Sequence, residues 1–330
     1  MTQDIDRGRR RVLATAARSA AVAGLVPACA LAQSYPSRPV RLLVPVSAGG
    51  GTDMIARVVA DQLSRGMKQP WVVENQGGAG GQIASQATAR AEPDGYNLMI
   101  GYVSTHGTLP AVRKVPYDPI RDFTHIAMIG GAPNVLVAQP SGPASFEDFL
   151  AEVRTHPGKA SYASAGVGTI THLVFEGLKL ATNTSVLHVP YRGIAPGIND
   201  MVAGQVQYAM PGLAGVLPYI RAGKLRALAV TGPDRHPLLP EVRTLKEIGI
   251  PHFEAVQWVG IMGPAHLPPA VVQDLSAAVA QVLGRKETAD KLAGEGIRVM
   301  PMSQQDFSAY VAADLARWRT IVKERGLQET

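Results

Sequence analysis

The chain has little cysteine, few aromatic residues and few charges, and these shortages exclude several classes of protein. One of its 330 residues is a cysteine, Cys29, so no disulfide can form within it. Aromatic residues make up 5% and charged residues 18%, and no basic cluster with interleaved aromatic residues points to nucleic acid. Hydrophobic residues reach 46%, with 34 glycines and 25 prolines, which favours two compact lobes with many short loops.

Motifs for cofactors, metals and nucleophilic catalysis are also missing. The dinucleotide motif G-x-G-x-x-G fails because Met54 and Ile83 stand where its third glycine is needed, and no G-x-x-x-x-G-K-[ST] occurs. The hydrolase motif G-x-S-x-G is approached only around Ser164, without its first glycine. His172 and Glu176 have the spacing of two metal ligands on a helix, but no third ligand is in sight. We therefore expect no cofactor, no metal and no enzymatic activity.

The first 32 residues have the pattern of a cleaved export signal. Arginines precede an apolar run too short to span a membrane, and Ala30-Leu31-Ala32 forms an A-x-A cleavage site. Arg9-Arg10 resembles a twin-arginine signal, while the general secretion route and a lipid anchor at Cys29 stay open. Removing the five arginines and two aspartates of this segment leaves 27 basic and 24 acidic residues, so the net charge falls from +6 to about +3. We expect a periplasmic protein.

The remaining chain alternates segments of strand and helix character. Strand, helix, strand, helix and strand follow one another within residues 42–101, which predicts a parallel sheet covered by helices. A second set follows, and extended crossovers near 131–137 and 253–262 predict two lobes with a cleft between them. The predicted strands are 42–46, 71–75, 97–101, 135–140, 160–164, 185–191, 206–210, 225–232 and 253–264. The predicted helices are 53–65, 82–91, 146–156, 170–181, 195–203, 214–223, 268–284, 287–295 and 303–325.

Two loops, Ser47–Asp53 and Ser164–Thr169, place glycines and hydroxyl-bearing residues between a strand and a helix N-terminus. The first N–H groups of a helix have no partner within the helix, and the helix dipole favours an anion there. One loop lies in each predicted lobe, so together they can hold a carboxylate from two sides. Tight turns alone would also explain the glycines, and this alternative stays open.

Long motifs with a family resemblance run through these loops and beyond. They are VPVSAGGGTDMIAR, VVENQGGAGGQIAS, PDGYNLMIG, STHGTLPAV, VPYDPIRDFTHIAMIG, YASAGVGTITHLVFEGLK, VPYRGIAPGINDMVAGQV and IRAGKLRALAVTG. In this order they resemble the extracytoplasmic solute receptors of tripartite tricarboxylate transporters, the Bug family. The resemblance covers nearly all of the chain after the signal.

The resemblance implies a type II periplasmic-binding-protein fold, an α/β Venus flytrap with two lobes and a hinged ligand cleft. Residues 33–133 plus 258–330 would form lobe I, and residues 134–257 would form lobe II. It further implies a monomer that captures a small carboxylate and delivers it to a membrane permease with one large and one small subunit.

The resemblance also implies a ligand site. In the family, backbone amides of the first glycine loop and ordered waters hold one carboxylate, and an aspartate at the position of Asp53 anchors this loop. Other contributions come from the loop after the third strand, from the second lobe and from an aspartate near the cleft rim. The implied positions, together with the departure discussed next, are Ser47, Ala48, Gly49, Gly50, Gly51, Thr52, Asp53, Ser104, Thr105, His106, Ser164, Ala165, Gly166, Gly168, Thr169, Arg192, Gly193, Ala195, Asp200 and Met210.

The stretch 207–215, QYAMPGLAG, departs from the family, which usually has Asp or Asn there. If Met210 and Leu213 face the cleft, the distal end of the ligand meets apolar surface, which disfavours a second strongly polar group. The departure therefore predicts an aromatic or less polar carboxylate rather than a citrate-like one. Arg192 can clamp a second carboxylate or remain a solvated rim residue, and His106 can donate to the ligand or stabilise its loop.

Two other functions stay open at this point. Presentation of the ligand to a membrane sensor would use the same binding features, and a permease pair encoded next door would favour transport. A secreted hydrolase with Ser164 and His172 would need a carboxylate that orients the histidine, together with an oxyanion hole. The missing G-x-S-x-G motif argues against it.

Overall fold

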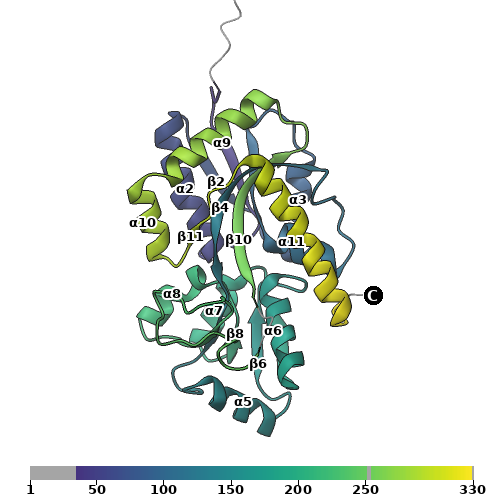
Figure 1. Cartoon of the computed structure of the whole chain (residues 1–330), viewed down its shortest axis with the longest axis vertical. Helices are drawn as coiled ribbons and strands as arrows, with labels where there is room; N and C mark the ends of the chain where they lie inside the picture. Colours follow the sequence, from purple (N-terminus) through teal and green to yellow (C-terminus); the bar gives the residue numbers. More distant parts are fainter. Residues whose placement is uncertain (1–34, 251–253, 329–330) are drawn as a thin grey trace, which may run out of the picture. The chain divides into compact units, whose positions relative to one another are not determined.

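The computed structural model describes residues 35–250 and 254–328. The chain divides into two units, Met1–Ser37 and Arg38–Thr330. In the first unit, the peptide bond between Tyr35 and Pro36 is cis. The predicted export signal, its cleavage site and Cys29 lie outside the described residues. The second unit contains two sheets, each with helices packed beside it (Figure 1).

The first sheet has the strand order β11-β4-β10-β3-β1-β2. Strand β1 pairs in parallel with both β2 and β3, and helices α2 and α3 connect these strands, which confirms the predicted parallel sheet covered by helices. Strand β10 pairs antiparallel with β3 and β4, and β11 pairs antiparallel with β4. The elements are β1 (Val40–Val44), α2 (Gly51–Met67), β2 (Trp71–Asn75), α3 (Gln82–Ala89), β3 (Asn97–Tyr102), α4 (Leu109–Val112), β4 (Phe123–Pro133), β10 (Val256–Pro264) and β11 (Arg298–Val299).

The second sheet has the strand order β7-β6-β8-β5-β9. Strand β6 pairs in parallel with β7 and β8, while β5 pairs antiparallel with β8 and β9. The helices between these strands were predicted from their spacing to within one or two residues at each end. The elements are β5 (Val135–Ala138), α5 (Phe146–Thr155), β6 (Ser161–Ser164), α6 (Ile170–Thr182), β7 (Leu187–Pro190), α7 (Ile194–Val202), β8 (Tyr208–Ala209), α8 (Leu213–Arg221) and β9 (Arg226–Val230).

Extended segments connect the two sheets. Strand β4 passes directly into β5 through Asn134, and β10 carries the chain back, so the predicted crossovers are confirmed. Figure 1 shows β4 and β10 side by side in the first sheet, from which they run toward the second. The N–H of Asn134 donates to the Thr231 hydroxyl at 2.9 Å, and that hydroxyl donates to the Ala255 carbonyl at 2.8 Å. Through Thr231, these two hydrogen bonds connect the segment between β4 and β5 to the segment that leads into β10. We call the part built on the first sheet lobe I and the part built on the second lobe II.

Strand β4 was not predicted, although it has 11 residues. Its two glycines interrupt a strand pattern, and the structure shows why they are there. A Cβ at Gly130 would come within 2.3 Å of the Arg298 carbonyl oxygen, and one at Gly131 within 2.5 Å of Val256. The neighbouring strands approach too closely for any side chain at these positions.

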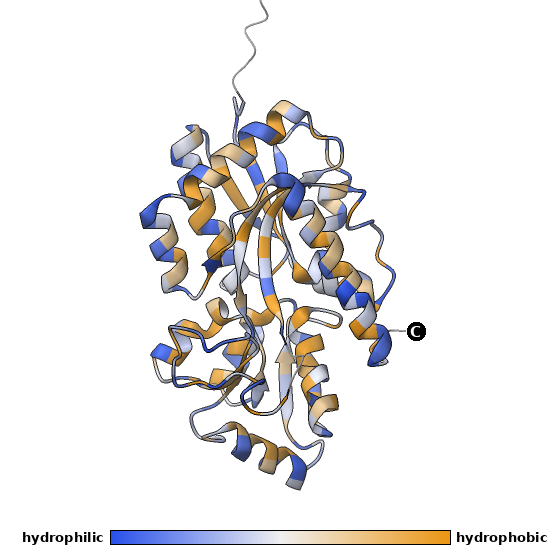
Figure 2. Ribbon diagram, viewed as in Figure 1, coloured by the Kyte–Doolittle hydropathy of each residue, from blue (hydrophilic) through white to orange (hydrophobic). Residues whose placement is uncertain are grey.

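Three C-terminal helices pack in lobe I: α9 (Pro269–Leu283), α10 (Lys286–Gly294) and α11 (Gln304–Glu324). The Trp258 indole N–H on β10 donates to Asp314 of α11 at 2.8 Å, and Phe307 packs against the same indole. Figure 2 shows helices that carry both apolar and polar residues, as expected where one face covers a sheet. None of the helices within residues 35–250 and 254–328 combines the length and the apolar character needed to cross a bilayer.

Candidate functional site

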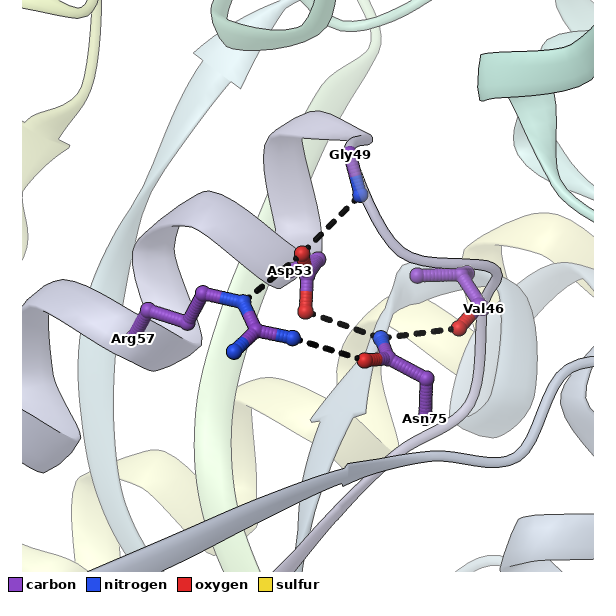
Figure 3. Close-up of polar contacts among 5 residues, drawn as sticks. All are labelled: Val46, Gly49, Asp53, Arg57 and Asn75. Atoms are coloured by element: carbon purple, nitrogen blue, oxygen red, sulfur yellow. Dashed lines mark hydrogen bonds and ion pairs between the residues drawn. The ribbon is translucent and has the colours of Figure 1, made fainter.

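Asp53 holds the first glycine loop from within the first turn of α2 (Figure 3). Its Oδ2 accepts hydrogen bonds from the Gly49 N–H at 2.9 Å and from Arg57 at 3.0 Å. Its Oδ1 accepts one from the Asn75 amide at 2.8 Å, and the same amide also donates to the Val46 carbonyl at 3.1 Å. Burial alone would raise the pKa of Asp53, but the hydrogen bonds from Arg57, Gly49 and Asn75 bring it below its ordinary value. An ionised, buried carboxylate therefore fixes the loop.

The N-terminus of α2 is open to a ligand. Its N-cap is Gly50, which has no side chain that could accept from the first turn. Within the described residues, no acceptor is found for the N–H groups of Gly51 and Thr52. The Asp53 carboxylate accepts hydrogen bonds from the loop and from β2. It therefore does not occupy the N–H groups of Gly51 and Thr52. A fixed pair of N–H groups at a helix N-terminus is a place where a carboxylate binds.

A small cavity lies between the two lobes at this point. Its volume open to water is about 20 Å³, which is room for about one or two water molecules. In this arrangement the cavity is too small for a ligand with several carbon atoms. Lobe I contributes Val46, Ser47, Gly50, Gly51, Thr52, Tyr102 and Ser104, lobe II contributes Ala165, Ile170, Thr171 and Ile194, and the connecting strand β10 contributes Gln257.

The polar part of this lining is uncharged. It consists of four aliphatic hydroxyls, the Tyr102 phenol and the Gln257 amide, together with backbone groups. Burial, partly offset by a hydrogen bond from Ser104, raises the pKa of Tyr102 to about 12, so the phenol stays protonated at neutral pH. Among the lining residues there is no arginine, lysine or histidine, so an anion here depends on N–H groups, hydroxyls and helix dipoles.

Two hydrogen bonds join the lobes at the edges of the cavity. The Ser47 hydroxyl donates to the Arg192 carbonyl, and the Ile170 N–H donates to the Ser104 hydroxyl oxygen at 3.1 Å. Helix α7 also begins at the cavity. Its N-cap, Gly193, has a φ of +104° and approaches the Ser47 N–H so closely that a Cβ would lie 3.0 Å from it. The first turn of α7 thus faces the N-terminus of α2.

The second glycine loop differs from the first, because its N–H groups are already engaged. The hydroxyls of Ser164 and Thr171 accept from Gly166 and Ala165, and the His172 ring accepts from Gly168. The Thr169 N–H donates to the Gly166 carbonyl, and the Ile170 N–H donates across the cleft to Ser104. Of the predicted residues in this loop, only Ala165 lines the cavity.

Several other predicted residues do not reach the cavity. His106 is fully buried with its ring 4.6 Å from that of Phe123, and Thr105 bonds to its Nδ1 at 2.8 Å. Burial lowers the pKa of His106 well below its ordinary value, so the ring is neutral. This placement favours a role in stabilising the loop over donation to a ligand.

The rim and loop-tip positions are also away from the cavity lining. The side chain of Arg192 is exposed, and Asp200 accepts a hydrogen bond from Tyr191 at 2.7 Å. Ala48 and Gly49 are exposed at the tip of the first loop, and Ala195 is half-buried in the first turn of α7.

The apolar stretch 207–215 does not form the distal wall that the sequence analysis expected. Met210 and Leu213 are fully buried, and neither lines the cavity. Leu213 packs against Gly296 instead, and the Met210 carbonyl accepts from the Asn134 amide at 2.8 Å. The apolar lining comes from Val46, Ala165, Ile170 and Ile194.

Six lining residues were not predicted from the sequence: Val46, Tyr102, Ile170, Thr171, Ile194 and Gln257. Five of them stand within three residues of a predicted position, so for these only the extent of the loops was misjudged. Gln257 carried a separate signal, because it is a polar residue within the apolar run of β10.

The structure pairs Ser164 with His188 rather than with His172. Ser164 Oγ lies 2.6 Å from His188 Nε2, and the His188 and His172 rings stack 4.3 Å apart. Within the described chain, no carboxylate is hydrogen-bonded to His188, and Glu176 bonds to Tyr162 and Lys179 instead. No cluster of three or more histidine or acidic side chains in the described residues is arranged to hold a metal ion. This geometry lacks the third member of a hydrolytic triad.

Comparison with known proteins identifies the family. The model of the tripartite tricarboxylate transporter family receptor matches residues 55–327. The chain belongs to this family. BugT of Bordetella pertussis is 33% identical to this receptor over 319 residues, which cover 96% of this chain and 98% of BugT. The shared family and the two-sheet architecture confirm the predicted two-lobe fold of a solute-binding protein.

Solved structures agree with this family. The periplasmic binding protein BugD has a TM-score of 0.87 at 32% identity, with 90% of this chain and 100% of BugD covered. An R. palustris protein solved with adipate has a TM-score of 0.85 at 35% identity, with coverages of 88% and 98%. MatC of Rhodopseudomonas palustris, solved with bound malate, has a TM-score of 0.84 at 31% identity, with coverages of 87% and 100%.

Proposed function

We propose that this receptor captures a small carboxylate at the N-terminus of α2, between its two lobes, and delivers it to a tripartite tricarboxylate transporter permease. The observation that carries the proposal is the pair of N–H groups at Gly51 and Thr52, which find no acceptor in the described part of the chain and belong to residues that line the cavity. In the proposal, residues 33–133 plus 258–330 form lobe I and residues 134–257 form lobe II. An export signal cleaved after Ala32 brings the chain to the periplasm.

The groups that line the cavity explain how the receptor can both bind and release an anion. Thr52 also lines the cavity, and its hydroxyl can add a neutral donor to the carboxylate. A neutral site of this kind becomes strong only when the lobes exclude water, because hydrogen bonds and dipoles act more strongly at low dielectric. Opening of the lobes readmits water and weakens the binding of the anion. This suits a protein that must release its ligand to a permease.

The bound ligands of similar proteins support the class of ligand. Two structures of 31% and 35% identity hold malate and adipate, which are both aliphatic dicarboxylates. Aromatic carboxylates stay within the proposed class, because Tyr102, Ile170 and Ile194 provide apolar contact surface in the cavity.

A thermal-shift screen of aliphatic, aromatic and amino-acid carboxylates tests the proposed binding. Each acid is paired with its neutral amide, so that only the charge differs. At a hundredfold excess over its dissociation constant, a ligand adds about 2.7 kcal/mol to the free energy of unfolding, which raises the melting temperature by several degrees. We expect shifts with acids only. Absence of a shift from every carboxylate, or equal shifts from the amides, contradicts the proposal.

Delivery is tested separately in cells. Deletion of the receptor gene should abolish uptake of the labelled carboxylate identified in the screen, while growth on an unrelated carbon source continues. Unchanged uptake, with loss of a transcriptional response to the same carboxylate, would instead favour presentation of the ligand to a membrane sensor.

A further inference from the structure

Gln257 occupies a special place in the cavity. It is the second residue of β10, where the chain crosses from lobe II to lobe I, and it pairs with Ala132 of β4. It supplies the side-chain amide of the cavity lining, and it comes from a connecting strand, whereas the other lining residues come from within the lobes. Figure 1 shows β10 in this position.

The alternation of side chains along β10 directs Gln257 to the cavity. Val256 and Trp258 point to the opposite face of the strand, since successive residues alternate. Val256 packs over Gly131, and the Trp258 indole donates to Asp314 on α11. Gln257 is thus the residue at this crossing whose side chain faces the ligand space.

The amide of Gln257 is confined but chemically unsatisfied. A Cβ at Gly212, the N-cap of α8, would lie 2.8 Å from Cδ, 2.9 Å from Oε1 and 3.1 Å from Nε2 of Gln257, so the amide lies directly against this backbone. Its Oε1 is buried without a hydrogen-bond partner in the described part of the protein. An unpaired buried carbonyl oxygen is costly unless another group donates to it.

We propose that Gln257 is a specificity residue that selects carboxylate ligands carrying a hydroxyl group. This inference rests on the proposed binding of a carboxylate. A hydroxyl can donate to Oε1 and accept from Nε2, whereas an ionised carboxylate can only accept and therefore leaves the buried Oε1 without a donor. Two parts of the receptor therefore contact the ligand. The N–H groups of α2 bind its carboxylate, and the Gln257 amide on β10 binds its hydroxyl.

Pairs of acids that differ only by a hydroxyl group test this inference by calorimetric titration. The pairs are malate with succinate and mandelate with phenylacetate. On the unchanged receptor, we expect the hydroxy acid of at least one pair to bind about tenfold more tightly, as for a hydrogen bond to an otherwise unpaired buried group. In Gln257→Met, which keeps the length of the side chain, this ratio should fall to about one, while the deoxy acid keeps its affinity within about threefold.

Matched variants separate selection from a general effect on the hinge. Val256→Ala changes the same strand on its other face and should leave the ratio unchanged. Gln257→Asn, which shortens the amide, serves in place of Gln257→Met if melting curves show that the latter does not fold.

Each outcome has a distinct meaning. An unchanged ratio in the Gln257 variant, or an equal loss for both acids of a pair, overturns the inference. Binding confined to carboxylates without a hydroxyl group also overturns it and leaves the proposed function standing. If no carboxylate binds the unchanged receptor, the proposed function itself fails.

Discussion

The loops SAGGGT (47–52) and SAGVGT (164–169) have nearly the same composition but opposite hydrogen bonding. Both connect a strand to a helix, and both face the other lobe. The first loop is held through the single N–H of Gly49, and its donors at Gly51 and Thr52 find no acceptor among residues 35–250 and 254–328. In the second loop the residues from Ala165 to Thr169, apart from Val167, donate their N–H groups within lobe II.

The difference comes from the residues beside each loop rather than from the glycines. Asp53 is anchored by Arg57 and Asn75, so it accepts from one loop N–H only. Near the second loop, Thr171 and His172 offer acceptors from within α6, and Ser164 adds a third from β6. A glycine loop therefore offers a ligand site only when its acceptor neighbours are few or occupied elsewhere.

Replacement of Asp53 by alanine should have the largest effect, because it removes the acceptor that holds the first loop. The Gly49 N–H and the Arg57 guanidinium lose a buried, charged acceptor, which lowers the free energy of unfolding by about 2–3 kcal/mol. Urea-induced unfolding at pH 7 measures this. Asp61→Ala, on the same helix with a half-exposed pair to Arg65, should cost less than about 0.5 kcal/mol. Equal losses in the two variants would contradict the anchoring role of Asp53.

Gly51→Ala should come next, with a specific effect on binding. A Cβ at this position would lie 2.8 Å from the Gly215 N atom in lobe II, so the added methyl group prevents full closure. We expect the dissociation constant of the carboxylate to rise about tenfold or more. Gly66→Ala in the same helix, with no contact closer than 3.6 Å, is the control, and it should leave affinity unchanged.

Two serines at corresponding positions offer the sharpest contrast between the loops. Ser164→Ala removes a buried hydroxyl that accepts from Gly166, so we expect a stability loss of about 1 kcal/mol and an affinity change within about threefold. Ser47→Ala removes a bond between the lobes and should weaken binding about fivefold while the stability of the free receptor stays the same. Denaturation and calorimetry on both variants check this, and the reverse pattern would refute the assignment of roles.

The smallest expected effect is a pH dependence in lobe II. Burial, with a contribution from neighbouring His172, lowers the pKa of His188 to about 4, against about 6.5 for an unfolded histidine. Between these values the unfolded chain binds the proton first, so the stability is complete above pH 6.5 and declines as the pH falls toward 4. The ring is partly exposed, so the change should be about 1 kcal/mol or less. Urea unfolding at pH 7.5 and 4.5 should show a smaller difference in His188→Gln, and an unchanged difference would exclude His188 as the source.

The fold could be predicted to a large extent because helical spacing and apolar runs are local properties. Helix α6, predicted as 170–181, spans Ile170–Thr182. Strand β4 escaped prediction because Gly130 and Gly131 are dictated by the approach of β10 and β11, which lie far away in the sequence.

The site could be predicted only in part. The pattern indicated the open N-terminus of α2, and the family resemblance indicated the anchor at Asp53, as the geometry of this loop now shows. The sequence did not reveal that the N–H groups of the second glycine loop are already engaged, because hydrogen bonds such as those to Thr171 and His172 depend on the folded loop. Met210 follows the two-residue strand β8, outside any regular element, so no periodic pattern indicated the direction of its side chain.

A crystal structure of the receptor with a carboxylate that raises its melting temperature tests the central claim most directly. Adipate and malate are the first two probes, because similar receptors were solved with them. The account predicts carboxylate oxygens within about 3 Å of the N–H groups of Gly51 and Thr52, with the second glycine loop bonded as it is here. A carboxylate held instead by the N–H groups of residues 165–169, with their present bonds broken, would contradict it.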